Sequence, residues 1–229
     1  MKIFISSFYL LLIFNINLKS NPFENNELEQ DHIKPSNEEY LNKLISNGRL
    51  LLDDGETDSV KLLLDGIYRE FSSEINSNFE IYFEYNLLKG KYFNLTRDYF
   101  AAIDIFDSLE DEIKKEDSPN YEWQIQLYNE LGYANYKKAN YRKAINHYLI
   151  SLRTCQNYTE NSIELIYILR RIVELYLFQD KNHDAKEYFD RCIYLIDSLN
   201  YPSNKKLFDS YIICTLYYNM LSETDKALK

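Results

Sequence analysis

The stretch Tyr128-Asn129-Glu130-Leu131-Gly132, with Ala144 and Tyr148 after it, sets a spacing that recurs along the whole chain. Valine or alanine recurs at intervals of 42, 42, 41 and 42 residues, at Val60, Ala102, Ala144, Ala185 and Ala227. Each of them lies 12 residues after one member of a second series, Gly48, Gly90, Gly132, Val173 and Thr215. A fixed period of roughly 20–50 residues predicts a solenoid, in which each unit buries its apolar face by stacking on its neighbours.

Residues that break helices or form loops recur with nearly the same period. They are spaced by 42, 42, 42 and 41 residues, at Pro35, Ser77, Pro119, Asn161 and Pro202. A second polar break, such as Thr96-Arg97-Asp98, interrupts each unit and supplies residues that cap helix N-termini. Two breaks per period predict one helix hairpin per unit. We therefore predict an all-α, right-handed α-solenoid of antiparallel hairpins with about four and a half repeats, in units of about 38–76, 77–118, 119–160, 161–201 and 202–229.

The same residues resemble a known repeat family. Tyr128, Leu131 and Gly132, followed by Ala144 and Tyr148, resemble the tetratricopeptide repeat signature W-x-x-L-G-x-x-Y…A-x-x-x-F. The residues that define the packing on this register are Gly48, Val60, Gly90, Ala102, Leu131, Gly132, Ala144, Tyr148, Tyr176, Ala185, Phe189 and Ala227. The period is about eight residues longer than the family's 34. One added turn on each helix, about 7.2 residues in all, keeps both apolar faces in phase.

A tetratricopeptide-like array implies a scaffold that binds a protein or peptide, with the first helix of each hairpin lining the concave face. On this register the candidate partner-binding residues are Leu87, Lys91, Asn129, Tyr133, Tyr136, Lys137, Tyr167, Arg170 and Glu174. Aromatic side chains among polar ones suit a peptide or a partner helix. Ordinary solvated helix surface is the alternative for any one of them. The Lys-and-Asn pattern of chaperone-type units that clamp a terminal carboxylate is not reproduced here.

The amino terminus forms a separate segment. Lys2 precedes a largely apolar run over residues 3–14, too short to span a bilayer, since a spanning helix needs about 20 residues. This run and the polar tail through Ser20 predict a secretory signal peptide over residues 1–20. An uncleaved interfacial anchor and a buried amino-terminal helix are the alternatives. Residues 21–37 predict a flexible leader. Cleavage implies an exported, periplasmic or extracytoplasmic protein; otherwise we expect a cytoplasmic or peripherally anchored one.

Composition and motif content argue against several activities. A formal net charge of −10 argues against binding nucleic acid, because phosphate contacts need clustered Lys and Arg. The five glycines form no phosphate-cradling loop, and the three histidines have no evident acid or nucleophile partner. Cys155, Cys192 and Cys214 lack metal-ligand spacing. Cys192 and Cys214 can form a disulfide in an exported chain, but buried thiols are the favoured interpretation. The sequence predicts no catalytic residue, cofactor or metal.

The repeat pattern at the carboxyl end also bears on the function that we expect. Lys229 lies two residues after Ala227, so the fifth unit stops where its second helix begins. This predicts a truncated gene or a fragment of a longer chain, with an apolar end face through which copies can self-associate. The layout resembles the tetratricopeptide sensory or scaffold region of bacterial signalling proteins. We expect an exported, non-enzymatic binding scaffold with a protein or peptide ligand; the alternative is an intracellular peptide-responsive regulator of the same family.

Overall fold

The computed structural model describes residues 37–116, 120–158, 163–198, 215 and 217, which all belong to one compact unit, Pro35–Lys229. The elements in this part of the chain are eight α-helices of 15 to 21 residues, without a strand. They are α2 (Asn37–Asp53), α3 (Thr57–Ser77), α4 (Phe79–Leu95), α5 (Tyr99–Ile113), α6 (Tyr121–Lys137), α7 (Tyr141–Tyr158), α8 (Ile163–Phe178) and α9 (Asn182–Ser198). The predicted all-α fold of packed helix hairpins is confirmed.

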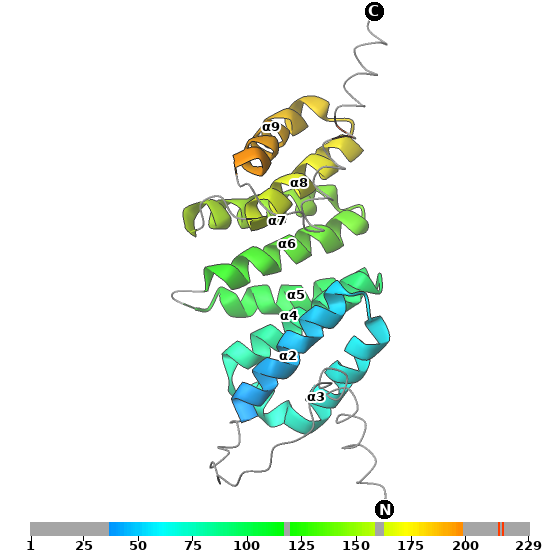
Figure 1. Cartoon of the computed structure of the whole chain (residues 1–229), viewed down its shortest axis with the longest axis vertical. Helices are drawn as coiled ribbons and strands as arrows, with labels where there is room; N and C mark the ends of the chain where they lie inside the picture. The colour runs from blue at the N-terminus through cyan, green and yellow to red at the C-terminus, as the bar shows by residue number, and fades with distance from the viewer. Residues whose placement is uncertain (1–36, 117–119, 159–162, 199–214, 216, 218–229) are drawn as a thin grey trace, which may run out of the picture. The chain divides into compact units, whose positions relative to one another are not determined.

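Consecutive helices pair as the hairpins α2–α3, α4–α5, α6–α7 and α8–α9, and each hairpin packs on the next (Figure 1). The first helices of successive hairpins also contact one another, as α2–α4, α4–α6 and α6–α8. No corresponding contact joins the second helices α3, α5, α7 and α9 within the described ranges. The first helices therefore form the tighter, inner row, as expected for a solenoid of helix pairs. None of the helices described is long and apolar enough to cross a membrane.

Each hairpin turns through one residue with left-handed backbone. These residues are spaced by 42, 42 and 41 positions, at Gly55 (φ 79°), Arg97 (φ 67°), Ala139 (φ 60°) and Asp180 (φ 57°). The N–H of the following residue donates to the carbonyl five positions earlier, as from Asp98 to Phe93 at 2.9 Å. This bond is the Schellman arrangement that closes a helix C-terminus. Only the first turn uses glycine, although glycine tolerates this backbone best.

Side-chain caps begin several of the helices. Asp98 accepts from the N–H of Ala101 at 3.2 Å, so the N-cap predicted for this polar break is confirmed. Asn78 and Asn120 cap α4 and α6 in the same way. Glu56, which precedes α3, makes no side-chain cap. Side-chain caps therefore specify the starts of α4, α5 and α6 locally.

Glycines in the first helices allow large rings of the second helices to approach the backbone. A Cβ atom added at Gly90 would lie 2.2 Å from the Phe106 ring, and one added at Gly132 would lie 2.5 Å from the Tyr148 ring. Phe106 and Tyr148 have 0% and 1% exposed surface. Small residues of the second helices are equally enclosed, at Val60, Ala102, Ala144 and Ala185. This alternation of small and large residues sets the distance between the two helices of a hairpin.

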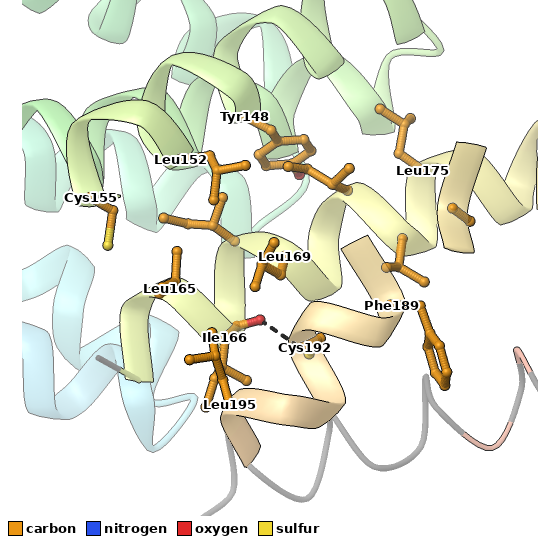
Figure 2. Close-up of a cluster of buried hydrophobic side chains, with 14 of the residues drawn as sticks. Tyr148, Leu152, Cys155, Leu165, Ile166, Leu169, Leu175, Phe189, Cys192 and Leu195 are labelled. Carbon is orange, nitrogen blue, oxygen red and sulfur yellow. Dashed lines mark hydrogen bonds between the residues drawn. The ribbon is translucent and has the colours of Figure 1, made fainter. Parts of the chain in front are cut away.

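The last described hairpins share one apolar cluster. Figure 2 shows Tyr148 and Leu152 of α7 directed toward Leu169 of α8, with Phe189 of α9 on the other side. The buried thiol of Cys192 donates to the carbonyl oxygen of Ile166 at 3.8 Å. Tyr176 is partly buried against this cluster, whereas Leu131 of α6 is fully buried in the cluster that contains Phe83 and Phe106. Cys214, Ala227, the predicted signal peptide and the breakers Pro35, Pro119, Asn161 and Pro202 lie outside the described residues.

We predict that replacing two different glycines by alanine has opposite effects on the stability of the protein. Gly90→Ala lowers the free energy of unfolding by about 1–3 kcal/mol, because its Cβ overlaps the Phe106 ring. The matched control is Gly66→Ala in α3, where no atom lies within 4 Å of the added Cβ. It stabilises by about 0.5–1 kcal/mol through backbone entropy. Urea unfolding measures both, and Phe106→Leu should restore part of the loss in Gly90→Ala. Equal stability of the two alanine variants would contradict the close-approach argument.

Candidate functional site

The inner row of helices carries a groove with a volume of about 750 Å³. Its lining comes from the carboxyl ends of α2 and α4, from α6 between Tyr121 and Tyr133, and from α8 between Ile163 and Arg171. The groove therefore crosses all four first helices obliquely. Its walls mix aromatic, amide and charged side chains of both signs. Such a lining suits a ligand that carries both apolar and hydrogen-bonding groups.

The structure brings four of the nine predicted partner-binding residues together in this groove: Lys91, Asn129, Tyr133 and Tyr167. Glu174 does not line the groove, but its carboxylate binds the groove residue Arg171. Tyr136 and Lys137 lie near the hairpin turns instead. The Tyr136 ring contacts the ring of Phe178, and the Lys137 amine lies 5.1 Å from the centre of the Tyr136 ring.

Two of the predicted residues are buried rather than presented to a partner. Leu87 has 1% exposed surface and packs in the cluster that contains Phe83 and Phe106, so its assignment to the groove is corrected. Arg170 has 7% exposed surface and lies 4.9 Å from the Tyr167 ring. The neighbouring Arg171 lines the groove in its place. Adjacent residues of an α-helix point in directions that differ by about 100°, so an assignment that is wrong by one position selects the wrong side chain.

Sequence reasoning missed several groove residues on the same helices. The most informative are Arg49, Asn94, Gln126, Glu130 and Arg171. Arg49 lies 42 positions before Lys91, so the repeat period itself could have found it. Asn94 and Gln126 lie three positions from the predicted residues Lys91 and Asn129, on the same helix faces.

Polar side chains tie α4 to α6 across the groove floor. The Lys91 amine donates to Gln126 Oε1 at 2.8 Å. Asn94, with 3% exposed surface, donates through Nδ2 to Glu130 Oε2 at 2.8 Å and to the Glu130 carbonyl at 3.3 Å. The amide oxygens of Asn94 and Asn129 are buried and have no hydrogen-bond partner. Buried acceptors without a partner are costly, so a ligand that donates hydrogen bonds would relieve that cost.

Glu84 links three of the inner helices at one end of the groove. Its carboxylate accepts from Arg49 of α2 through one oxygen and from the indole Nε1 of Trp123 in α6, at 2.9 Å, through the other. The Trp123 ring stacks on Phe83 with ring centres 4.5 Å apart. The exposed fraction of the Glu84 side chain is 17%. A single partly buried carboxylate therefore holds α2, α4 and α6 in register.

Arg171 is the most enclosed charged group of the groove. Its guanidinium lies 4.7 Å from the Tyr133 ring and 5.0 Å from the Tyr167 ring. Its NH1 donates to Glu174 at 3.2 Å and its NH2 donates to the Tyr167 hydroxyl at 2.7 Å. Burial lowers the pKa of Arg171, but the neighbouring Tyr167, Tyr148 and Glu174 outweigh this effect and raise it overall. Burial raises the pKa of Tyr133 to about 12, so this phenol stays protonated and can donate at neutral pH.

Neither a metal-ligand cluster nor a histidine lies in the groove of the part of the chain that the structure describes. The described residues contain no group of three or more His, Cys, Asp or Glu side chains that could hold a metal ion. His147, which is partly buried in α7, stacks on Tyr128 of α6, and burial lowers its pKa. It does not line the groove.

Comparison with known proteins relates the chain to helical-repeat structures. No protein-family model matches the sequence, and no curated protein matches it either. Among solved structures, the apo form of RapI has a TM-score of 0.64 and 12% identity, over 82% of this chain and 52% of RapI. A Rap protein complexed with competence and sporulation factor has a TM-score of 0.55 and 16% identity, over 83% and 52%. BtubC from P. vanneervenii has a TM-score of 0.54 and 12% identity, over 82% and 69%.

These identities establish the fold alone. The chain shares the helical-repeat fold of the Rap structures, and it spans about half of their length.

We predict that Glu84→Ala lowers the free energy of unfolding by about 1–3 kcal/mol, because it leaves the partly buried Arg49 and the Trp123 indole without their acceptor. Trp123 is the chain's only tryptophan, so its fluorescence during denaturation reports on this region directly. The matched control is Glu80→Ala, an exposed position one turn earlier in α4, which should change stability by less than about 0.5 kcal/mol. A Glu84 variant as stable as the Glu80 variant would show that the link contributes nothing.

Proposed function

We propose that this chain is a non-enzymatic scaffold that binds an extended peptide segment in the groove of its inner helices. The observation that carries the proposal is the pair of buried amide oxygens of Asn94 and Asn129, which lie on adjacent helices of the groove and lack donors. An extended peptide offers backbone N–H groups at regular spacing, and each needs an acceptor when it is buried. Aromatic side chains such as Tyr121 and Tyr133 provide apolar contact area beside these acceptors.

The size of the groove supports a short ligand. Packed helices lie about 8–10 Å apart, so three spacings from α2 to α8 cover roughly 27 Å. An extended chain advances about 3.3–3.6 Å per residue, so about eight residues cover this distance. A peptide of this length, rather than a folded domain, matches the groove.

Peptide binding in this groove is compatible with two cellular settings. In the first, residues 1–20 direct export and the scaffold binds its ligand outside the cytoplasm, as the sensory part of a signalling protein. In the second, the chain is an intracellular peptide-responsive regulator, which is supported by its likeness to the Rap protein complexed with competence and sporulation factor. Binding is expected in either setting, because the groove residues belong to the same helices.

Affinity selection tests the proposal. The full chain is mixed with a random octapeptide library, and retained peptides are identified by mass spectrometry after gel filtration. We expect Asn129→Ala to lower retention at least about tenfold, because the ligand loses a buried hydrogen bond, with little change in stability. Asn157→Ala, at an exposed position near the end of α7, is the matched control and should bind as the wild type does. Retention of no peptide by the wild type would refute the proposal.

A further inference from the structure

The floor of the groove gathers hydrogen-bond donors around Arg171. Two of its N–H groups are used, one by Glu174 and one by the Tyr167 hydroxyl. The Nε of Arg171 is buried and has no partner. The Glu174 carboxylate is shared with Arg170, whose NH1 lies 3.8 Å from it. Arg171 therefore keeps donors that no protein acceptor uses.

A second donor without a partner lies on α7. The hydroxyl of Tyr148 is buried without a partner, and the residue has 1% exposed surface. Figure 2 shows this side chain directed from α7 toward α8, the helix that carries Arg171. Burial raises the pKa of Tyr148 well above its usual value, while Arg171 acts in the opposite direction. The hydroxyl is therefore protonated at neutral pH and close enough to Arg171 to interact with it electrostatically.

The two tyrosines that flank Arg171 contribute further hydrogen-bond donors. The rings of Tyr133 and Tyr167 face the guanidinium and restrict its plane. The Tyr167 oxygen accepts from Arg171, so its own O–H remains able to donate. Glu130 of α6 lies within electrostatic reach of Tyr133, and its carboxylate accepts a hydrogen bond from Asn94. Donors from α6 and α8 thus gather around a guanidinium whose carboxylate partner, Glu174, is shared with Arg170.

We infer that this part of the groove is a receptor for one carboxylate of the bound peptide, held by Arg171 together with the hydroxyls of Tyr133 and Tyr167. The carboxylate belongs either to an acidic side chain or to the peptide's carboxyl terminus, since both present the same two oxygens. Charge-assisted hydrogen bonds to a guanidinium are among the strongest in proteins. The buried Tyr148 hydroxyl supports the site through its electrostatic interaction with Arg171. The inference rests on the proposed peptide binding and specifies which chemical group the peptide must carry.

Three synthetic octapeptide pools separate the two sources of carboxylate. All are acetylated at the amino terminus and randomised over uncharged residues. The first ends in a free acid, the second in an amide, and the third in an amide with one glutamate at a random position. We expect the wild-type full chain to retain the first or the third pool at least about tenfold better than the second. Whichever of these two pools is retained better identifies the source of the carboxylate.

Substitutions in the receptor test which of its residues bind the carboxylate. Arg171→Gln should abolish the preference for carboxylate, and Tyr133→Phe should weaken it several-fold while keeping the ring against Arg171. Tyr148→Phe removes a buried hydroxyl that has no partner, so it should weaken the preference without lowering the midpoint of thermal unfolding. This variant remains informative if Arg171→Gln fails to fold. Arg142→Gln, at an exposed position on α7, is the matched control and should behave as the wild type.

The possible failures are distinguishable. Equal retention of the acid and amide pools by the wild type would overturn the carboxylate receptor and leave peptide binding intact. A carboxylate preference that survives in both Arg171→Gln and Tyr148→Phe would also overturn it. Retention of none of the pools would refute peptide binding, and the receptor with it.

Discussion

The close approach of an aromatic ring to a glycine backbone is the contact on which the rest of the unit depends. Gly90 receives Phe106 and Gly132 receives Tyr148, and a single methyl group at either glycine would overlap the ring. These contacts fix the distance between the two helices of a hairpin and thereby the spacing of the inner row. They also determine where the far end of Tyr148 lies, because its ring passes Gly132 and continues toward α8. The side chain that packs on Gly132 therefore also interacts electrostatically with Arg171 of the groove.

The groove is built from bonds that join helices rather than from one loop or one helix. Glu84 connects α2, α4 and α6, whereas Asn94 and Lys91 connect α4 to α6. Arg171 of α8 lies against Tyr133 of α6. Because solenoid units contact mainly their neighbours, such ties are what keep side chains from four hairpins at fixed separations. A peptide that spans the groove would meet a surface that is already organised, which reduces the entropy cost of binding.

Periodicity was sufficient to predict the fold but only part of the site. The interval between Gly90 and Gly132 reflects the packing of the two helices in each hairpin. This packing repeats along the chain because each unit buries the same face. Groove residues need not repeat, because each meets a different part of a ligand. Lys91 and Tyr133 occupy equivalent positions with different chemistry. The error at Arg170 arose because packing equivalence between α6 and α8 did not predict which of two adjacent arginines faces the groove, and that choice depends on the rotation of the helix.

The unsatisfied polar groups of the groove argue that stability alone did not select its residues. Replacing Tyr148 by phenylalanine would keep the ring against Gly132 and remove a buried hydroxyl without a partner. Replacing Asn129 would likewise remove an amide oxygen that the protein leaves unpaired. Natural sequences depart from such local optima mainly where function requires it. Three of the groove-lining residues, Asn94, Asn129 and Arg171, carry buried polar atoms of this kind, and a bound ligand that pairs with them would offset the cost that they impose on stability.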